Sequence, residues 1–240
     1  MTHVNPTHPP HPTAAPLADV YLLKSRTPQA LALARSFEER GARVLNPAAA
    51  TELCQDRKAM ADLALRAGLP FARTHTPGTL TDLTSLPTLP LPHPLVVKSR
   101  HSRREDLVAR ADIPAQLRAL AAQWPEEPVV IQEFTPNSGW DHKLWVIADK
   151  VFATHRRSEL ATTPTPPPPP PLTPTDLPQT WLTLVRTVGK VFALDVYGVD
   201  IITTPTGAPL IVDINAFPGI RNQPGAPEAL ATLTLRAAEG

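Results

Sequence analysis

Three oxygen-bearing side chains stand close together near the end of the sequence: Asp200, Asp213 and Asn215. Two short apolar runs flank a cluster of threonine, proline and glycine between them, a pattern that predicts a β-hairpin. If its turn centres between residues 206 and 207, Asp200 lies directly opposite Asp213, with Cβ atoms about 5 Å apart. Asn215 follows Asp213 by two positions and therefore shares its face of the sheet.

Two facing carboxylates repel each other unless a proton or a cation lies between them. A ligand set made only of oxygen atoms suits a hard cation, Mg²⁺ before Zn²⁺. The hairpin therefore predicts a magnesium site. The alternative is a polar stripe that faces solvent on an edge hairpin, because a slip of one residue in the register would separate the three side chains.

The composition of the chain limits the class of protein. Its 240 residues are 42% hydrophobic and carry a net charge of +1, which allows a sizeable core and argues against nucleic acid or a membrane surface as the main partner. The single cysteine, Cys54, excludes an internal disulfide framework and favours a reducing, cytoplasmic location. We see no apolar run long enough to span a membrane and no secretory signal.

Helix and strand signals divide the chain into four parts. Residues 1–16 are rich in proline and histidine and are predicted to be a disordered tail. A strand–helix–strand pattern follows, which predicts a small parallel α/β domain over residues 17–54. The rest of the chain mixes predicted helices and strands, and the family resemblance described below divides it into two larger parts, 55–134 and 135–240. The second of them contains a proline-rich insertion at 162–178, which is predicted to be polyproline or disordered.

These parts contain the following expected elements. Strands are expected at 20–23, 43–45, 95–98, 128–134, 143–148, 151–155, 197–202 and 210–217. Helices are expected from Pro28 to Gly41, at 56–67, from 112–114 to 124, at 181–193 and at 228–238. The strands at 143–148 and 151–155 form a hairpin around residues 149–150, so that arginines at its far end approach Asp141 and Lys143.

Several basic residues lie where they could contact an anion. Lys58 is in the first turn of a helix, where the helix dipole favours anions, so the lysine gains little there without one. Lys98 ends an apolar strand, where it either reaches solvent or is held rigidly against a phosphate. The basic turn at 101–104 could cover an anionic ligand or could be a solvated loop.

The order of these motifs resembles the ATP-grasp superfamily over about residues 20–219. The most specific part is Gly198-Val199-Asp200-Ile201 followed by Val212-Asp213-Ile214-Asn215-Ala216-Phe217-Pro218-Gly219. It looks like the metal-binding hairpin of RimK-like glutamate ligases, which usually carry glutamate where this chain has Asp213. The aspartate is closer to the form found in inositol-trisphosphate kinases, and residues 143–149 and 157–158 are similar to that group too.

The resemblance implies an α/β (α+β) ATP-grasp fold, in which the two larger parts sandwich the nucleotide. It also implies a role for each motif. Contacts to ATP phosphates would come from Lys58 and Lys98, and adenine would be read by the hinge Gln132, Glu133 and Phe134. Mg²⁺, or Mn²⁺ in its place, would be held by Asp200, Asp213 and Asn215. The transferring phosphoryl group would be steadied by Lys143, Arg156 and Arg157, with either arginine as the functional one.

Three functions remain open from the sequence. The favoured one is a carboxylate–amine ligase that forms an acyl phosphate, releases ADP and phosphate, and acts on a small-molecule, amino-acid or peptide acceptor. The second is a small-molecule kinase, since Arg100, His101, Arg103 and Arg104 suit a polyanionic acceptor. The third is a non-catalytic nucleotide-binding module, because residues 101–106 lack the glycines that usually cover the phosphates. The short N-terminal domain also allows a homodimer that shares the acceptor pocket.

Overall fold

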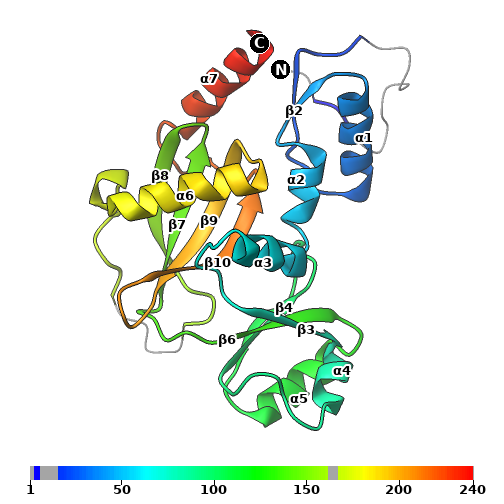
Figure 1. The fold of residues 1–240 in the computed structure, drawn as a ribbon, viewed down its shortest axis with the longest axis vertical. Helices are drawn as coiled ribbons and strands as arrows, with labels where there is room; N and C mark the ends of the chain where they lie inside the picture. The colour runs from blue at the N-terminus through cyan, green and yellow to red at the C-terminus, as the bar shows by residue number, and fades with distance from the viewer. Residues whose placement is uncertain (1–2, 6–15, 162–166, 240) are drawn as a thin grey trace.

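The computed structural model describes residues 3–5, 16–161 and 167–239 (Figure 1). Most of the predicted tail at 1–16, and the start of the proline-rich insertion, therefore lie outside the described residues. The described chain forms a small N-terminal unit and two four-stranded sheets, which lie one above the other in the view of Figure 1. Within these ranges, no helix is long and apolar enough to cross a membrane.

The N-terminal unit has the predicted β-α-β order. Strands β1 (Val20–Leu22) and β2 (Arg43–Leu45) pair in parallel, and α1 (Pro28–Glu39) connects them. The side chain of Thr27 caps α1 by accepting a hydrogen bond from the Ala30 amide. A further short helix, α2 (Ala48–Leu53), follows β2 and was not expected from the sequence.

The smaller of the two subdomains is an antiparallel sheet with helices on one face. Its strands are β3 (Thr74–Thr79), β4 (Leu95–Ser99), β5 (Val108–Ala111) and β6 (Pro128–Glu133), in the order β3-β6-β4-β5. Helices α4 (Leu80–Ser85) and α5 (Pro114–Gln123) cover the face that carries Val97 and Ile131. The opposite face carries Val96 and Lys98, because side chains alternate along a strand.

The larger sheet is also antiparallel. Its strands are β7 (Trp140–Ile147), β8 (Lys150–Arg157), β9 (Val196–Thr203) and β10 (Pro209–Ala216), in the order β10-β9-β7-β8. Helix α6 (Gln179–Phe192) crosses one face, and α7 (Ala226–Glu239) packs with the opposite face at the end nearest the N-terminal unit. Helix α3 (Arg57–Arg66) packs with α6, so its core belongs to the larger sheet.

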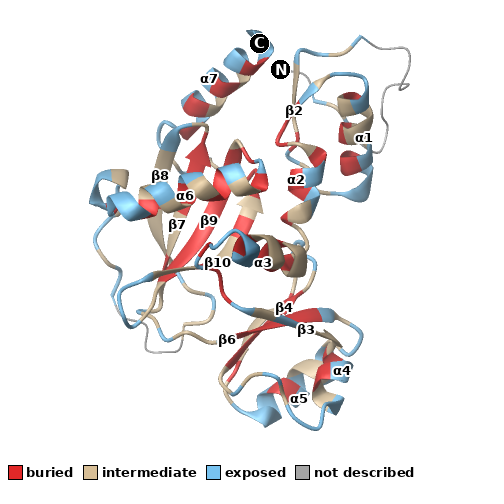
Figure 2. Ribbon diagram, in the orientation of Figure 1, coloured by how far each residue is buried: buried red, intermediate tan, exposed pale blue. Residues whose placement is uncertain are grey.

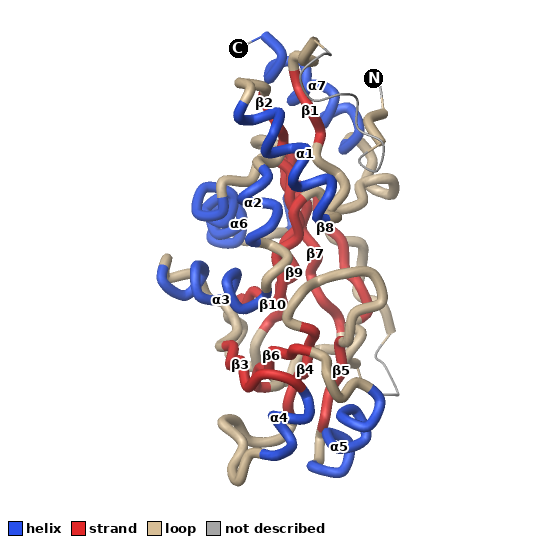
Figure 3. The backbone as a smooth tube through the Cα atoms, turned by 90° about the vertical axis from the view of Figure 1, so that its right-hand side faces the viewer, coloured by secondary structure: helices blue, strands red, loops and turns tan. Residues whose placement is uncertain are grey.

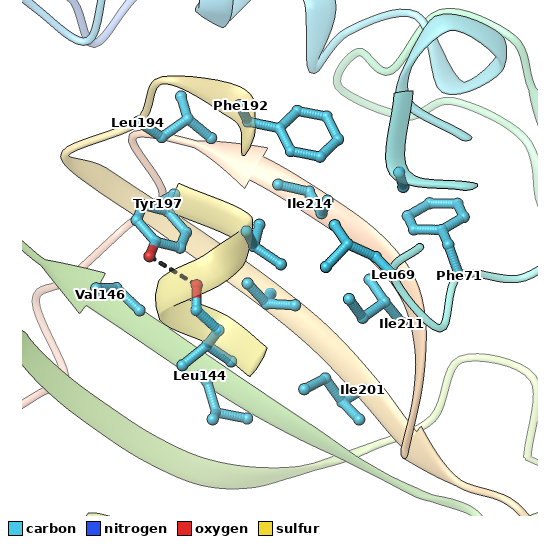
Figure 4. Close-up of a cluster of buried hydrophobic side chains, with 14 of the residues drawn as sticks. Leu69, Phe71, Leu144, Val146, Phe192, Leu194, Tyr197, Ile201, Ile211 and Ile214 are labelled. Carbon is cyan, nitrogen blue, oxygen red and sulfur yellow. Dashed lines mark hydrogen bonds between the residues drawn. The ribbon is translucent and has the colours of Figure 1, made fainter. Parts of the chain in front are cut away.

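The main hydrophobic core lies between the larger sheet and helices α3 and α6 (Figures 2 and 4). Alternate residues of the strands face it, among them Leu144, Ile201 and Ile214. The buried hydroxyl of Tyr197 donates to the carbonyl of Val185 at 2.8 Å, so this polar group is satisfied inside the core. Because the even-numbered residues of β7 face this core, its odd-numbered residues face the smaller subdomain or α7.

Two local expectations differ from the structure. The β7–β8 turn is formed by Ala148 and Asp149 rather than by residues 149–150, since Ile147 pairs with Lys150 and Ala148 adopts a φ of 54°. The proline-rich stretch was expected to contain no helix, but it includes a 3₁₀ turn, η1 (Pro174–Asp176). A capping box formed by Thr173 and Asp176 stabilises that turn.

The N-terminal unit is fastened to the larger sheet. Asn46, which is fully buried, donates to the Val196 carbonyl at 2.6 Å and accepts from the amides of Asp195 and Val196. Leu45 joins the apolar cluster formed with α7. A side view shows β1 and β2 in line with the strands of the larger sheet (Figure 3). The unit therefore has a fixed position relative to β9 and β10.

Candidate nucleotide and metal site

The hairpin of β9 and β10 brings Asp200 directly opposite Asp213, as predicted, but the register of the hairpin shifts before this pair is reached. Ile211 pairs with Ile201, so the turn centres half a residue earlier than expected. A β-bulge at Val212 then inserts one unpaired residue and restores the expected pairing. Asn215 lies opposite Gly198 on the same strand pair.

These three polar side chains line a cavity of about 270 Å³. Lys98, Val108 and Gln132 line it from the smaller sheet, while Lys143 and Asp200 line it from the larger sheet. Its wall includes six basic and six acidic side chains. The basic residues are Arg26, Arg57, Lys98, Arg103, Lys143 and Arg156, and the acidic ones are Asp106, Glu133, Asp141, Glu159, Asp200 and Asp213. The cavity is thus highly charged but has no net charge.

On the larger sheet, acidic and basic side chains pair across neighbouring strands. Lys143 donates to Asp200 at 2.8 Å, and Arg156 lies 3.4 Å from the other oxygen of Asp200. Arg156 also lies 3.5 Å from Asp141, its cross-strand partner, as the sequence predicted. Burial raises the pKa of Asp141, against the opposing effect of Arg156. Burial would lower the pKa of Arg156, but Asp200 and Asp141 outweigh it and raise that pKa.

Lys98 is held rigidly, not exposed to solvent. Its side chain is buried, and its ammonium group donates to the carbonyl of Val212, the bulge residue, at 2.9 Å. Burial lowers the pKa of Lys98, while Asp213 acts in the opposite direction. A charged group in such a place is costly unless a negative group compensates it. Lys98 therefore occupies a position suited to an anionic ligand.

Arg57, which sequence reasoning missed, lines the cavity where Lys58 was expected. Its guanidinium donates to the Ser99 carbonyl at 2.8 Å and to Asp106 at 2.6 Å, and lies 3.6 Å from Asp213. Burial would lower the pKa of Arg57, but Asp213 and Asp106 outweigh it and raise that pKa. The sequence correctly indicated a basic residue at the start of α3. Which of the neighbours Arg57 and Lys58 faces the cavity depends on the rotation of the helix about its axis, which the sequence did not give.

Two predicted residues lie outside the cavity wall. The ammonium group of Lys58 pairs with Asp62 one helical turn later, on the outer side of α3. Arg157 is exposed and pairs with Trp140 in the β7–β8 ladder. Of the two arginines left open by the sequence, Arg156 is therefore the one that lines the cavity.

The predicted hinge spans the end of β6, which finishes at Glu133. Gln132, Glu133 and Phe134 all line the cavity. Gln132 is fixed by a hydrogen bond to the Thr74 hydroxyl at 2.8 Å, and the Arg110 guanidinium stacks 3.8 Å from the centre of the Phe134 ring. The amide of Phe134 donates to the Pro94 carbonyl. Reading of adenine by this segment stays a prediction.

The glycine-poor segment at 101–106 is tied down by side chains. Arg103 makes a two-pronged ion pair with Glu127 at 2.7 and 2.8 Å, and Asp106 accepts from Arg57. Arg100 pairs with Asp56, the residue that caps α3. Arg103, the one arginine of this segment in the described cavity wall, is therefore already paired within the protein.

The donor set suits a magnesium ion that is shared with phosphate groups. The described residues contain no group of three or more His, Cys, Asp or Glu side chains arranged to hold a metal alone. Mg²⁺, however, is commonly held by one or two carboxylates together with substrate phosphates. Three buried atoms of the cavity wall lack a hydrogen-bond partner in the protein: Asp141 Oδ1, Arg57 Nε and Arg156 Nε. Such atoms are expected where a polar ligand completes the site.

Comparison with solved structures identifies the fold. A RimK-domain ATP-grasp protein from Sphaerobacter thermophilus superposes with a TM-score of 0.72 at 20% identity, over 99% of this chain and 86% of the other. An L-amino acid ligase from Bacillus licheniformis gives 0.56 at 19% identity, over 79% and 46% of the two chains. The macrocyclase MdnC from Microcystis aeruginosa, bound to its precursor peptide, gives 0.60 at 16% identity, over 87% and 68%.

No model of a known protein family matches the sequence, and no curated protein matches it at a significant level. At these identities the structural likeness identifies the fold and not the substrate. The chain has the ATP-grasp fold, as the sequence motifs predicted.

Proposed function

We propose that this protein is an ATP- and Mg²⁺-dependent carboxylate–amine ligase. The observation that carries the proposal is the pair of facing carboxylates, Asp200 and Asp213, in a cavity between the two sheets that also contains Lys98 and Arg57. Asp200, Asp213 and Asn215 would hold Mg²⁺ against the nucleotide phosphates. When bound, the ion would neutralise phosphate charge and orient the γ-phosphoryl group.

The protein's own residues would do the remaining work by position and charge. Lys98 and Arg57 would contact phosphate oxygens from the smaller sheet and α3. Lys143 and Arg156 would stabilise charge on the group in transfer, because phosphoryl transfer depends on positioned cations more than on a covalent protein group. Transfer to an acceptor carboxylate gives an acyl phosphate, and attack by an amine then forms the amide and releases phosphate.

Several structural neighbours support the ligase over the kinase. They include an L-amino acid ligase, a D-Ala:D-Ser ligase and a peptide macrocyclase. One support for the kinase was the basic group Arg100, His101, Arg103 and Arg104, but Arg100 and Arg103 each pair with an acidic residue of the protein. That surface is therefore less suited to a polyanionic acceptor than the sequence suggested.

The test is product analysis with Mg·ATP and a pool of amino acids, with and without hydroxylamine. A ligase releases ADP and free phosphate in equal amounts and yields a hydroxamate when hydroxylamine intercepts the acyl phosphate. Asp200→Asn should lower turnover at least a hundredfold, whereas Asp149→Asn, an exposed aspartate in the β7–β8 turn, should not. ADP formed with a phosphorylated acceptor and no free phosphate would overturn the ligase in favour of a kinase.

A further inference from the structure

One basic residue of the cavity wall differs from the other five. Arg57, Arg103, Lys143 and Arg156 each pair with a carboxylate, and Lys98 donates to a carbonyl. Arg26 has no such partner among the described residues, although it is partly buried and lines the cavity. Its guanidinium, which can donate two parallel hydrogen bonds to a planar oxyanion, is thus unused by the protein.

Arg26 is also the one contribution of the N-terminal unit, residues 17–54, to the described cavity wall. It lies between β1 and α1, in a segment that is fastened to the end of β10. Lys24, two residues earlier, donates to the carbonyls of Phe217 and Pro218 at 2.8 Å each. Because Asn46 fixes the same unit to β9, the position of Arg26 relative to Asp213 is set by the fold.

The surroundings of Arg26 are electropositive. Burial lowers the pKa of Lys24, and Arg26 and Arg221 lower it further. None of these three residues forms an ion pair with a carboxylate within the described chain. Burial raises the pKa of the Cys54 thiol to about 12. Asp213 raises this pKa further and Arg26 lowers it, so the charges of both residues act on the same buried thiol. Arg26 lines the same cavity wall as Asp213, the carboxylate that we assign to the metal.

We infer that Arg26 anchors the acceptor substrate by binding a carboxylate that does not react, so that the acceptor is an acidic amino acid or a peptide end that carries a second, reacting carboxylate. The inference rests on the proposed function, since it places a second ligand beside the nucleotide. A carboxylate held in both prongs of a guanidinium has its oxygens occupied and is a poor nucleophile. Arg26 is therefore suited to orienting the acceptor while the acceptor's other carboxylate approaches the γ-phosphoryl group.

The experiment compares each of the twenty common amino acids with its own α-carboxamide as a ligand of the protein loaded with Mg·ADP, so that the side-chain carboxylate of the acidic amino acids is unchanged. Thermal unfolding identifies the binders, and calorimetry measures their affinities for the parent, Arg26→Gln, Arg26→Lys and Arg43→Gln. Arg43 is an exposed arginine of β2 in the same unit and serves as the matched control. Affinity for Mg·ADP is measured first for every protein.

We expect at least one acidic amino acid to bind the parent at least tenfold more tightly than its α-carboxamide. Arg26→Gln should remove that preference, Arg26→Lys should restore part of it, and Arg43→Gln should keep it. The inference is overturned if no acid is preferred over its amide, if Arg26→Gln retains the preference, or if Arg26→Gln loses Mg·ADP affinity in parallel, which would assign Arg26 to the nucleotide. A parent that does not bind Mg·ADP would instead contradict the proposed function.

Discussion

At the scale of single residues, the candidate site balances buried charges in pairs. Asp200 is neutralised by Lys143 and Arg156, and Asp213 lies near Arg57. Lys98 is the exception, because its ammonium group donates to a carbonyl and not to a carboxylate. Isolated buried charges destabilise a folded protein, so a lysine in this position costs stability in the absence of an anionic ligand. That cost is consistent with a functional and not a structural residue.

Replacing Lys98 by methionine should separate stability from binding. The free protein should be as stable as the parent or more stable, by up to about 2 kcal/mol, while Mg·ATP affinity falls at least tenfold. Urea unfolding and calorimetry measure the two effects. A Lys98→Met protein that is strongly destabilised but binds Mg·ATP normally would show that Lys98 has a structural role.

The lowered pKa of Lys98 gives this comparison a pH dependence. The unfolded chain holds the proton up to about pH 10.5, whereas the folded chain releases it at lower pH, so rising pH favours the folded state. The parent should therefore gain stability relative to Lys98→Met as the pH approaches 10.5. Subtracting the free energy of unfolding of Lys98→Met from that of the parent cancels the contributions of Cys54 and Tyr197, which both proteins contain. A difference that stays constant with pH would contradict the lowered pKa of Lys98.

A second titration concerns His142, on the opposite face of β7. Its ring packs edge-on against His155 and Trp181, and burial, then His155, lower its pKa. As the pH falls through about 6.5, the unfolded chain takes up the proton first, so the free energy of unfolding should fall. His142→Phe keeps the ring packing and should lose less stability between pH 7.5 and 5.5. Equal losses in urea unfolding would rule out this histidine as the cause.

At the scale of elements, the bulge in β10 connects the two halves of the site. Val212 is the extra residue, and its carbonyl accepts the hydrogen bond from Lys98 of the smaller sheet. If Val212 were absent from the chain, Ile211 would still face the core, and Asp213 would directly follow Ile211 and would still lie opposite Asp200. The bulge is therefore unnecessary for the pairing of the carboxylates but provides a contact between the subdomains.

Deleting Val212 should consequently leave a folded protein whose site is loosened. We expect a melting temperature within a few degrees of the parent and Mg·ATP affinity reduced about tenfold, since one positioned hydrogen bond of a charged group is lost. Deleting Ile214 is the control, because it turns the following residues to the opposite face and should unfold the hairpin. Normal nucleotide affinity in the Val212 deletion would show that the bulge has no part in binding.

The elements show what the sequence could predict and why. Long periodic segments such as α1, α3 and α6, and strongly apolar strands such as β4 and β6, follow from hydrophobic spacing and helix caps. Strands β3 and β5 carry weak local apolar patterns, and pairing within the sheet stabilises them instead. Arg57 and Arg26 were missed for a related reason: their roles depend on helix phase and on contacts between units far apart in the sequence.

At the scale of the whole molecule, the N-terminal unit behaves as part of the larger subdomain. Asn46 has no exposed surface and makes three hydrogen bonds with the start of β9. Leu22 and Leu45 add apolar contacts with the cluster around α7. This attachment keeps Arg26 in the cavity wall, so the proposed acceptor site depends on it.

Asn46→Ala should leave buried backbone groups of Asp195 and Val196 without partners and lower the free energy of unfolding by roughly 3 kcal/mol. Hydrogen exchange should increase in β1 and β2 more than in the smaller sheet. Asn222→Ala, at an exposed position, is the control and should have little effect. Unchanged exchange in β1 and β2 would contradict the view that Asn46 fastens this unit.

Thermal unfolding with and without Mg·ATP tests the metal–nucleotide site in the parent and in Asp213→Ala, each protein being compared with its own free form. At about one hundred times its dissociation constant, the ligand should stabilise the parent by roughly 2.7 kcal/mol, or about 5 to 10 °C. The rise should require Mg²⁺ and should disappear in Asp213→Ala. A folded parent with no rise, or an equal rise in Asp213→Ala, would contradict the claim that the facing carboxylates of β9 and β10 hold the metal–nucleotide complex.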